Sequence, residues 1–145
     1  MPTHANDEAD IRRRLGQAVE AIRAMDLDAV MPVYAPDIVS FDIEPPLQHL
    51  GAEAKRKNWT KVFTIYQRPL GYEVRNLAIT VGTDVAFVRT LARLSGTLQS
   101  GQSAGYWVRW TTGWRKVEGD WRIVHDQISV PVDFETGKGL LNLEP

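Results

Sequence analysis

Two long segments near the C-terminus, rich in tryptophan and β-branched residues, constrain the fold of this chain most strongly. They form a predicted hairpin over residues 105–133, with arms at 106–114 and 121–130 and a turn that contains Gly119. Four of the five tryptophans lie between positions 107 and 121. Aromatic and β-branched residues suit a pleated, partly buried surface, and glycine tolerates the positive φ that a tight turn requires. The pattern therefore predicts two long antiparallel strands.

Neither arm of this hairpin alternates simply between apolar and polar residues. Trp110 and Ile128 lie on one parity of their strands, and polar side chains occupy the other parity: Arg109, Thr111, His125, Gln127 and Ser129. Because successive side chains of a strand point to opposite faces, both faces carry groups that need covering. We expect a helix on one side of this sheet and a cavity or a partner subunit on the other.

Three helices are predicted in the N-terminal half. From about Asp7 the apolar residues recur at helical spacing, which predicts a first helix with this inward stripe: Ile11, Leu15, Ala18, Ile22 and Met25. A short second helix is predicted over 27–34, capped by Asp26 or Asp28. A third is predicted over 51–66, with these inward residues: Ala54, Trp59, Val62, Phe63 and Tyr66.

Strands make up most of the remaining chain. Residues 38–43 predict an early strand that Pro45-Pro46 ends, and 72–81 and 85–95 predict two more before the hairpin. Helices followed by consecutive antiparallel strands indicate an α+β fold. We predict a single cone-shaped domain in which three N-terminal helices wrap a strongly curved, mostly antiparallel sheet and leave a pocket. Within this domain, 1–145, we expect a frayed arm at 1–6 and an irregular, surface-packed tail at 134–145.

Composition excludes several classes of protein. The 145 residues carry a net charge of -1, so no basic surface favours nucleic acid. The chain has no cysteine, which excludes disulfides, thiol nucleophiles and cysteine-based zinc sites. His4, His49 and His125 lack the spacing of a metal motif. Residues 1–10 lack the apolar core of a secretory signal, and no apolar run is long enough to span a membrane. We therefore expect a cytoplasmic protein that binds no metal, membrane or nucleic acid.

Several short segments resemble the nuclear transport factor 2-like superfamily, in particular its SnoaL-like and ketosteroid-isomerase-like members. They are residues 25–30, residues 34–37 with the strand to Asp42, Pro45-Pro46 with Gly51, and the run 119–129. The last run is also similar to the closing strand of the association domain of calcium/calmodulin-dependent kinase II. The resemblance covers roughly residues 8–133. It implies the cone fold, which hosts isomerases, cyclases, dehydratases, hydrolases and non-catalytic assembly domains.

Ketosteroid isomerase combines an aspartate base with an oxyanion hole made of a tyrosine and a protonated aspartic acid. The resemblance places that base on Asp42. It places the oxyanion tyrosine on Ala18, whose side chain cannot donate a hydrogen bond. It places the second oxyanion-hole acid in the strand 108–112, which contains no carboxylate. Steroid isomerisation by that route is therefore not expected.

Two carboxylates are the main catalytic candidates. Asp42 either faces the cavity, where desolvation would raise its pKa toward that of a useful base, or only caps a turn. The resemblance puts Val124, Asp126 and Ile128 on the cavity wall. Asp126 would then either form a carboxylate pair with Asp42 or be salt-bridged to one of three arginines: Arg89, Arg93 or Arg109.

The other candidate residues also have two interpretations each. Arg109 could hold an anionic ligand or lie in an interface, and His125 could line the pocket or have a structural or interface role. The aromatic residues could form either a pocket for a flat, mostly apolar ligand or part of the core: Tyr34, Trp59, Phe63, Trp107 and Trp110.

Two functions follow as hypotheses. The first is an isomerase, cyclase or dehydratase that transfers a proton on an apolar, carbonyl-bearing substrate without a cofactor, with Asp42 as general base and Asp126 or Arg109 orienting the substrate. The second is a non-catalytic ligand-binding or assembly module with a vestigial pocket. In both cases we expect a homodimer formed through the sheet face opposite the cavity.

Overall fold

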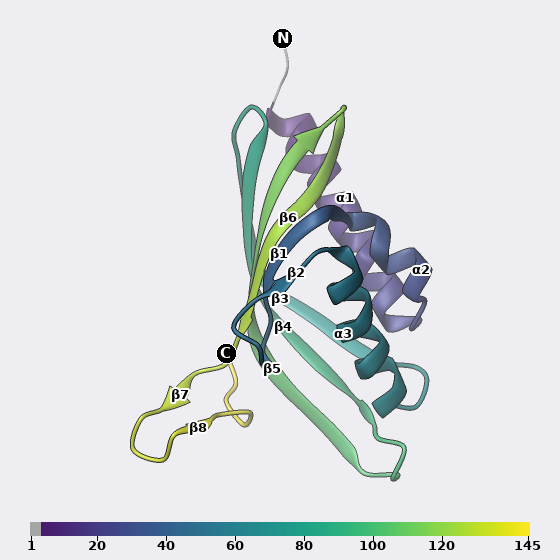
Figure 1. Ribbon diagram of the computed structural model, residues 1–145, viewed down its shortest axis with the longest axis vertical. Helices are drawn as coiled ribbons and strands as arrows, with labels where there is room; N and C mark the ends of the chain where they lie inside the picture. The colour runs from purple at the N-terminus through teal and green to yellow at the C-terminus, as the bar shows by residue number, and fades with distance from the viewer. Residues whose placement is uncertain (1–3) are drawn as a thin grey trace.

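The computed structural model describes residues 4–145, and its architecture is α+β (Figure 1). A curved six-stranded sheet has the order β2-β1-β6-β5-β4-β3, in which β1 and β6 are parallel and the other neighbours antiparallel. The helices are α1 (His4–Arg23), α2 (Leu27–Val30), the 3-10 turn η1 (Met31–Val33) and α3 (Ala52–Ile65). The long strands are β1 (Tyr34–Phe41), β3 (Gly71–Val81), β4 (Val85–Thr97), β5 (Ser103–Val117) and β6 (Asp120–Ser129), and β2 (His49–Leu50) is short.

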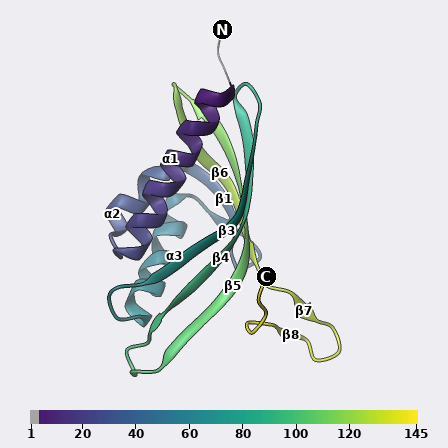
Figure 2. The same cartoon turned by 180° about the vertical axis from the view of Figure 1, so that it is seen from behind.

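All three helices lie on one side of this sheet, as the views from front and back agree (Figures 1 and 2). The predicted cone, a curved and mostly antiparallel sheet wrapped by three N-terminal helices, is thus confirmed. The predicted stripe of α1 is buried in the core between helix and sheet. The helix already begins at His4, so residues 4–6 of the expected frayed arm are helical. The remainder of that arm lies outside the described residues.

The predicted hairpin is formed by β5 and β6. Its turn consists of Glu118 and Gly119, which both have positive φ, 52° and 85°, as a tight hairpin turn requires. The pairing shifts once, because Gly113 pairs with His125 and Trp114 with Ile123, which leaves Val124 as an extra residue. As a result Ile123 and Asp126 are both buried, whereas Val124 and His125 are only partly buried.

The second helix is shorter than predicted. It ends at Val30, the 3-10 turn that contains Pro32 follows, and β1 begins at Tyr34, so Tyr34 belongs to a strand. Asp26 is the N-cap, and its side chain accepts a hydrogen bond from the backbone N–H of Ala29 at 3.2 Å. The missing amide hydrogen of proline is tolerated because η1 is a single turn.

Replacing the N-cap residue Asp26 is expected to lower the free energy of unfolding by a small amount. Asp26→Ala removes the acceptor for the Ala29 N–H, and loss of an N-cap costs about 1 kcal/mol. Urea denaturation should show this loss, and Asp37→Ala, at an exposed position of β1, should change stability by less than half as much. Equal effects of the two substitutions would contradict the assigned cap.

The chain ends in a second, two-stranded sheet made of β7 (Val132–Asp133) and β8 (Lys138–Gly139). The segment extends away from the domain on the side of the main sheet that is opposite the helices (Figures 1 and 2). The tail predicted to be irregular and surface-packed therefore contains a small hairpin and projects outward. Among the described residues, no helix is long and apolar enough to cross a membrane.

Candidate functional site

A cavity of about 270 Å³ lies between α3 and the concave face of the sheet. All four tyrosines of the chain contribute to its wall: Tyr34, Tyr66, Tyr72 and Tyr106. Trp59 from α3 and Trp110 from β5 add two indole rings, and both stack edge-on against Tyr72 between them. The wall therefore carries six tyrosine and tryptophan rings among aliphatic side chains, and three of the tyrosine hydroxyl groups come from different strands.

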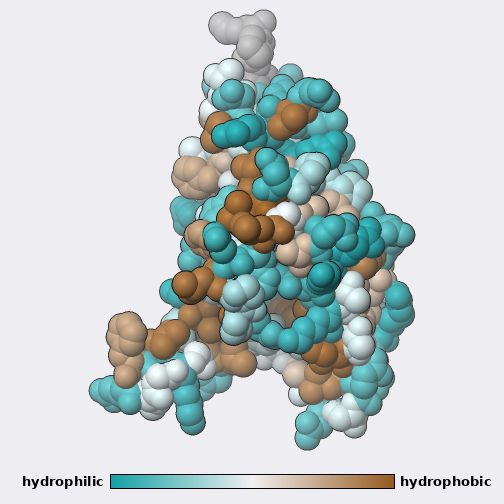
Figure 3. Space-filling view, viewed as in Figure 1, coloured by the Kyte–Doolittle hydropathy of each residue, from teal (hydrophilic) through white to brown (hydrophobic). Residues whose placement is uncertain are grey.

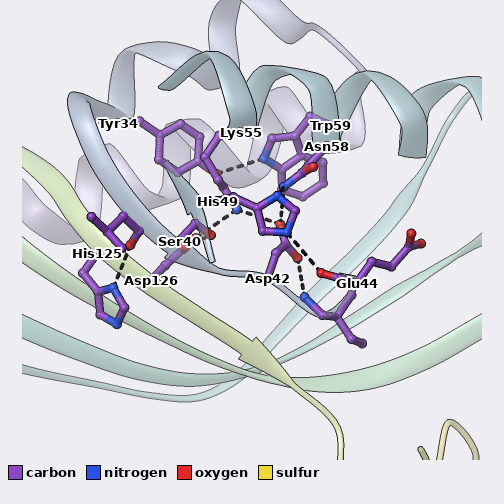
Figure 4. Close-up of polar contacts among 12 residues, drawn as sticks. Tyr34, Ser40, Asp42, Glu44, His49, Lys55, Asn58, Trp59, His125 and Asp126 are labelled. Carbon is purple, nitrogen blue, oxygen red and sulfur yellow. Dashed lines mark hydrogen bonds and ion pairs between the residues drawn. The ribbon is translucent and has the colours of Figure 1, made fainter. Parts of the chain in front are cut away.

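A buried lysine between two carboxylates forms the polar end of this cavity (Figure 4). The Nζ atom of Lys55 lies 3.1 Å from Oδ2 of Asp42 and 3.2 Å from Oδ2 of Asp126. The Lys55 side chain is only 3% exposed, Asp42 17% and Asp126 0%. Three remote segments meet here, because Lys55 comes from α3, Asp42 directly follows β1, and Asp126 lies in β6.

Asp42 is held as a carboxylate by several donors. Oδ2 accepts hydrogen bonds from Lys55 Nζ at 3.1 Å and from Asn58 Nδ2 at 2.9 Å, and Oδ1 accepts one from the Ile43 backbone at 2.8 Å. Burial by itself raises the pKa of Asp42, but the charge of Lys55 and these hydrogen bonds outweigh it, and the pKa lies below its ordinary value. The expectation that desolvation would raise this pKa is therefore wrong, because the ammonium group of Lys55 lies against the carboxylate and opposes the effect of burial.

Asp126 lies deeper than Asp42. Its Oδ1 accepts a hydrogen bond from the Ser40 hydroxyl, on the neighbouring strand β1. Its Oδ2 receives no hydrogen bond from the described residues and is balanced only by the charge of Lys55. The two carboxylates do lie close together, and the ion-pair partner of Asp126 is Lys55 instead of one of the three arginines considered from the sequence.

Tyr34 places a neutral hydroxyl beside this cluster. Its oxygen accepts a hydrogen bond from Trp59 Nε1 at 2.9 Å, and its ring centroid lies 5.5 Å from Lys55 Nζ. Burial raises the pKa of Tyr34 to about 12, although the charge of Lys55 opposes the shift. Tyr34 therefore keeps its own proton at neutral pH and can donate it in a hydrogen bond.

Asn58 and His49 extend the polar network toward solvent. Asn58 Nδ2 donates to Asp42 and lies 3.4 Å from Nδ1 of His49, while His49 Nε2 lies 3.1 Å from the Glu44 carbonyl oxygen. Because a carbonyl only accepts, His49 carries its proton on Nε2 and accepts from Asn58 at Nδ1. Within residues 4–145, no three His, Asp or Glu side chains are grouped so that they could hold a metal ion.

Six of the residues predicted for the site lie on the cavity wall: Asp42, Asp126, Tyr34, Trp59, Trp110 and Ile128. Phe63 and Val124 do not. Phe63 packs on Trp59 behind the wall, with ring centroids 5.7 Å apart, and the bulge at Val124 interrupts the predicted 124, 126, 128 alternation.

Arg109, Trp107 and His125 lie on the outer face of the sheet, away from the cavity. Arg109 Nε donates to the Ser129 hydroxyl at 3.1 Å, and Trp107 packs against the Arg75 guanidinium at 4.7 Å. His125 donates from Nδ1 to the Val39 carbonyl at 2.7 Å. For Arg109 and His125, the structural or interface interpretation agrees with where the structure places them, and Arg109 cannot orient a ligand inside the cavity of its own chain. Trp107 belongs neither to the cavity wall nor to the buried core, the two places considered for it from the sequence.

Sequence reasoning missed Lys55, Asn58 and three of the tyrosines as site residues. One signal was present in α3, since Lys55, Asn58, Trp59 and Val62 follow the spacing i, i+3, i+4, i+7 of one helix face. A lysine on the apolar face of a helix indicates either a snorkelling side chain or a buried ion pair. Tyr66, Tyr72 and Tyr106 carried no comparable signal, because only the folded sheet brings them together.

Comparison with known proteins places this chain in a family. A SnoaL-like domain model matches residues 11–133, whereas no curated protein matches. An NTF2-like protein of unknown function from Pseudomonas putida KT2440 is 30% identical, with a TM-score of 0.88 over 97% of this chain and 98% of that one.

Two more distant solved structures share the fold. One is a ketosteroid isomerase-like protein from Erwinia carotovora atroseptica SCRI1043, with a TM-score of 0.70, 22% identity and coverage of 83% of this chain and 93% of that one. The other is a hexachlorocyclohexane dehydrochlorinase, LinA type 2, with a TM-score of 0.75, 15% identity and coverage of 86% and 85%. Together with the domain match and the Pseudomonas structure, these findings show that the chain belongs to the SnoaL-like family of the nuclear transport factor 2-like superfamily.

Proposed function

We propose that the cavity binds a small, uncharged, mostly apolar molecule with a carbonyl group, and that Asp42 transfers a proton at the carbon next to that carbonyl. The observation that carries this proposal is an ionised carboxylate at the end of an aromatic cavity, beside a tyrosine that keeps its proton. The chemistry would be an isomerisation, a cyclisation or a dehydration, and it would use only side chains of this chain.

The charge of the site favours a neutral ligand. Two carboxylates and one ammonium group leave a net negative charge at the polar end of the cavity. A carboxylate or phosphate ligand placed there would be repelled and poorly solvated. A flat ring system, in contrast, suits a wall made of tyrosine and tryptophan rings.

The proposed step assigns one role to each polar group. The Tyr34 hydroxyl donates a hydrogen bond to the ligand carbonyl oxygen. Asp42 accepts the proton from the adjacent carbon, and the electron pair of that C–H bond moves toward the carbonyl, forming an enolate that Tyr34 stabilises. The proton then returns at another carbon, or a leaving group departs. Asp126 holds Lys55 in place and acts as a positioning residue.

One observation favours a second candidate, a ligand-binding module without catalysis. The same donors that hold Asp42 ionised also lower its pKa and occupy lone pairs that a base would need. On the other hand, the names of two proteins with this fold, a ketosteroid isomerase-like protein and a dehydrochlorinase, support chemistry in such a cavity.

The test separates binding from proton transfer. A panel of uncharged cyclic ketones and the corresponding carboxylates is screened by thermal shift, and hydrogen–deuterium exchange at the carbon beside the ketone carbonyl is followed by NMR in D₂O. We expect ketones and not carboxylates to stabilise the protein. Asp42→Asn should keep this stabilisation and lower the exchange rate about 100-fold.

Asp37→Asn is the matched control, since Asp37 is an exposed aspartate on β1, the strand that Asp42 directly follows. It should change neither readout. Stabilisation by ketones without any catalysed exchange would favour the binding module. Exchange that continues at the full rate in Asp42→Asn would show that another group is the base.

A further inference from the structure

Three of the four cavity tyrosines have a hydroxyl group without a partner. Trp59 donates a hydrogen bond to the hydroxyl of Tyr34, whereas the hydroxyl groups of Tyr66, Tyr72 and Tyr106 form none with any described residue. Polar groups inside a protein are nearly always paired, because an unpaired one loses its hydration without compensation. Three unpaired hydroxyl groups in the wall of one cavity are therefore unusual.

These hydroxyl groups border the open space of the cavity. Among the side chains of residues 4–145 that are not exposed, only Arg14 Nε and Asp126 Oδ2 are shielded from solvent without a hydrogen-bond partner. An unpaired tyrosine hydroxyl outside this pair of atoms must consequently reach open space. Tyr66 and Tyr72 are only 6% and 7% exposed, and all three tyrosines line the cavity. The space that their hydroxyl groups reach is therefore the cavity itself.

The register of the sheet places the three tyrosines around one part of β4. Leu94 pairs with Tyr72 of β3 on one side and with Tyr106 of β5 on the other. Gly96, the next residue of β4 on the same face, leaves room for the Tyr66 ring, since a Cβ there would lie 3.1 Å from Tyr66 Cδ1. The three residues thus form one group, which we call the tyrosine cluster.

The tyrosine cluster lies at the other end of the cavity from the buried lysine and its two carboxylates. Asp126 pairs with Thr112 of β5, and Tyr106 lies three inward positions further along that strand. The helix agrees, because Lys55 lies in the first turn of α3 and Tyr66 directly follows its last residue. Eleven residues of helix correspond to about 16 Å along the axis. The cavity therefore has two polar ends with apolar wall between them.

The mouth of the cavity is at the tyrosine end. Ile65, next to Tyr66, lines the cavity and is 42% exposed, and Glu44 and Lys61 on the same wall form an exposed ion pair. Figure 3 shows hydrophobic side chains among hydrophilic ones on this side of the molecule. A ligand that enters here passes the tyrosine cluster, and its leading end reaches Asp42.

The hydroxyl groups of the tyrosine cluster are uncharged at neutral pH. Burial raises the pKa of Tyr106 to about 12, and it also raises the pKa values of Tyr66 and Tyr72 above their ordinary value. A protonated phenol donates one hydrogen bond and accepts others. The cluster can therefore pair with an uncharged hydroxyl or carbonyl group.

We infer that the ligand of this cavity carries a second uncharged oxygen, in a hydroxyl or carbonyl group, which binds to the tyrosine cluster while its ketone lies at Tyr34 and Asp42. The inference rests on the proposed function and adds the class of substrate. The cavity of about 270 Å³ is slightly smaller than the roughly 300–1,000 Å³ of most ligand pockets. The substrate would be a ketone of one or two rings with an oxygen function at each end, and Tyr72 and Tyr106 would determine this specificity.

Two ketones that differ by one hydroxyl group test this inference. Isothermal titration calorimetry compares 4-phenylcyclohexanone with 4-(4-hydroxyphenyl)cyclohexanone, whose additional hydroxyl lies opposite the carbonyl group. We expect the wild type to bind the hydroxylated ketone about tenfold more tightly, as one additional hydrogen bond in a cavity allows. In the variant that combines Tyr72→Phe with Tyr106→Phe, the ratio of the two affinities should fall to about one, because the rings remain and only the hydroxyl groups are lost.

Tyr34→Phe is the matched control, because it removes a tyrosine hydroxyl at the other end of the cavity. It should weaken the binding of both ketones alike and keep their ratio near ten. The double variant should fold like the wild type by circular dichroism, since its two hydroxyl groups have no partner to lose. Equal affinities in the wild type, or a preference that survives the double substitution, would overturn this inference and leave the proposed function standing. Binding of neither ketone would instead reject the proposed function, and this inference with it.

Discussion

Replacing Lys55 with methionine is expected to lower the free energy of unfolding by about 3–5 kcal/mol, because it leaves two buried carboxylates without their counter-charge. The substitution keeps most of the side-chain volume and removes only the ammonium group that lies 3.1 Å from Asp42 and 3.2 Å from Asp126. Asp126 has no exposed surface through which water could replace that charge. Urea denaturation at neutral pH measures the loss directly.

Lys61 provides the matched control on the same helix. It forms an ion pair with Glu44 at 2.5 Å, but its side chain is 60% exposed. An exposed pair contributes little, so Lys61→Met should change stability by less than about 1 kcal/mol. A loss in Lys55→Met no larger than that in Lys61→Met would contradict the buried cluster.

The pH dependence of Lys55→Met adds a second signature. In the wild type the pKa of Asp42 is lowered, so Asp42 contributes stability above its unfolded pKa of about 3.9, and that stability is lost as the pH falls through the folded value. Without Lys55, the positive charge that lowers the pKa of Asp42 is gone, and burial raises this pKa. The variant should therefore gain stability on mild acidification, over a range in which the wild type gains none.

The elements that sequence predicted best are those whose signal is local. The stripe of α1 repeats every three or four residues, and the hairpin of β5 and β6 combines strand-forming residues with the Glu118-Gly119 turn. Each pattern is fixed by near neighbours along the chain, so it could be interpreted without knowledge of the rest of the fold. The N-cap at Asp26 is likewise a local signal, because it depends only on residues next to it in the chain.

The features that sequence did not predict depend on segments that are remote in the chain. Lys55 is stabilised in the interior only because Asp42, just after β1, and Asp126, in β6, lie against it. The sign of the Asp42 pKa shift results from the same contact. The bulge at Val124 reverses which side chains of β6 face inward, and no turn residue marks it in the sequence. A strict alternation therefore misplaced Val124, although it placed Asp126 and Ile128 on the cavity side.

The cavity tyrosines lead to a large predicted effect at high pH. Burial raises the pKa of Tyr34 from 10.0 to about 12, so between these values the unfolded chain releases a proton that the folded chain keeps. Stability should fall as the pH rises, by about 1.4 kcal/mol per pH unit for one such group, or nearly 3 kcal/mol over the interval. The pKa of Lys55 is also raised, despite the burial that lowers it, and adds a loss in the same direction. Urea denaturation across this range, with tyrosinate absorbance as the ionisation signal, measures both quantities.

Tyr34→Phe isolates the contribution of one phenol. At neutral pH the variant should lose about 1 kcal/mol, because Trp59 Nε1 loses its acceptor. At high pH its stability should decline less steeply than that of the wild type, since phenylalanine has no proton to release. Because the wild type loses more over this interval than its initial advantage of about 1 kcal/mol, the two curves should cross below pH 12. Tyr34 would then be the hydroxyl that stays protonated beside Asp42, which is the property that the proposed donation to a carbonyl oxygen requires. Parallel curves, together with tyrosinate absorbance that rises fully near pH 10 in the folded protein, would show that Tyr34 ionises like an exposed phenol.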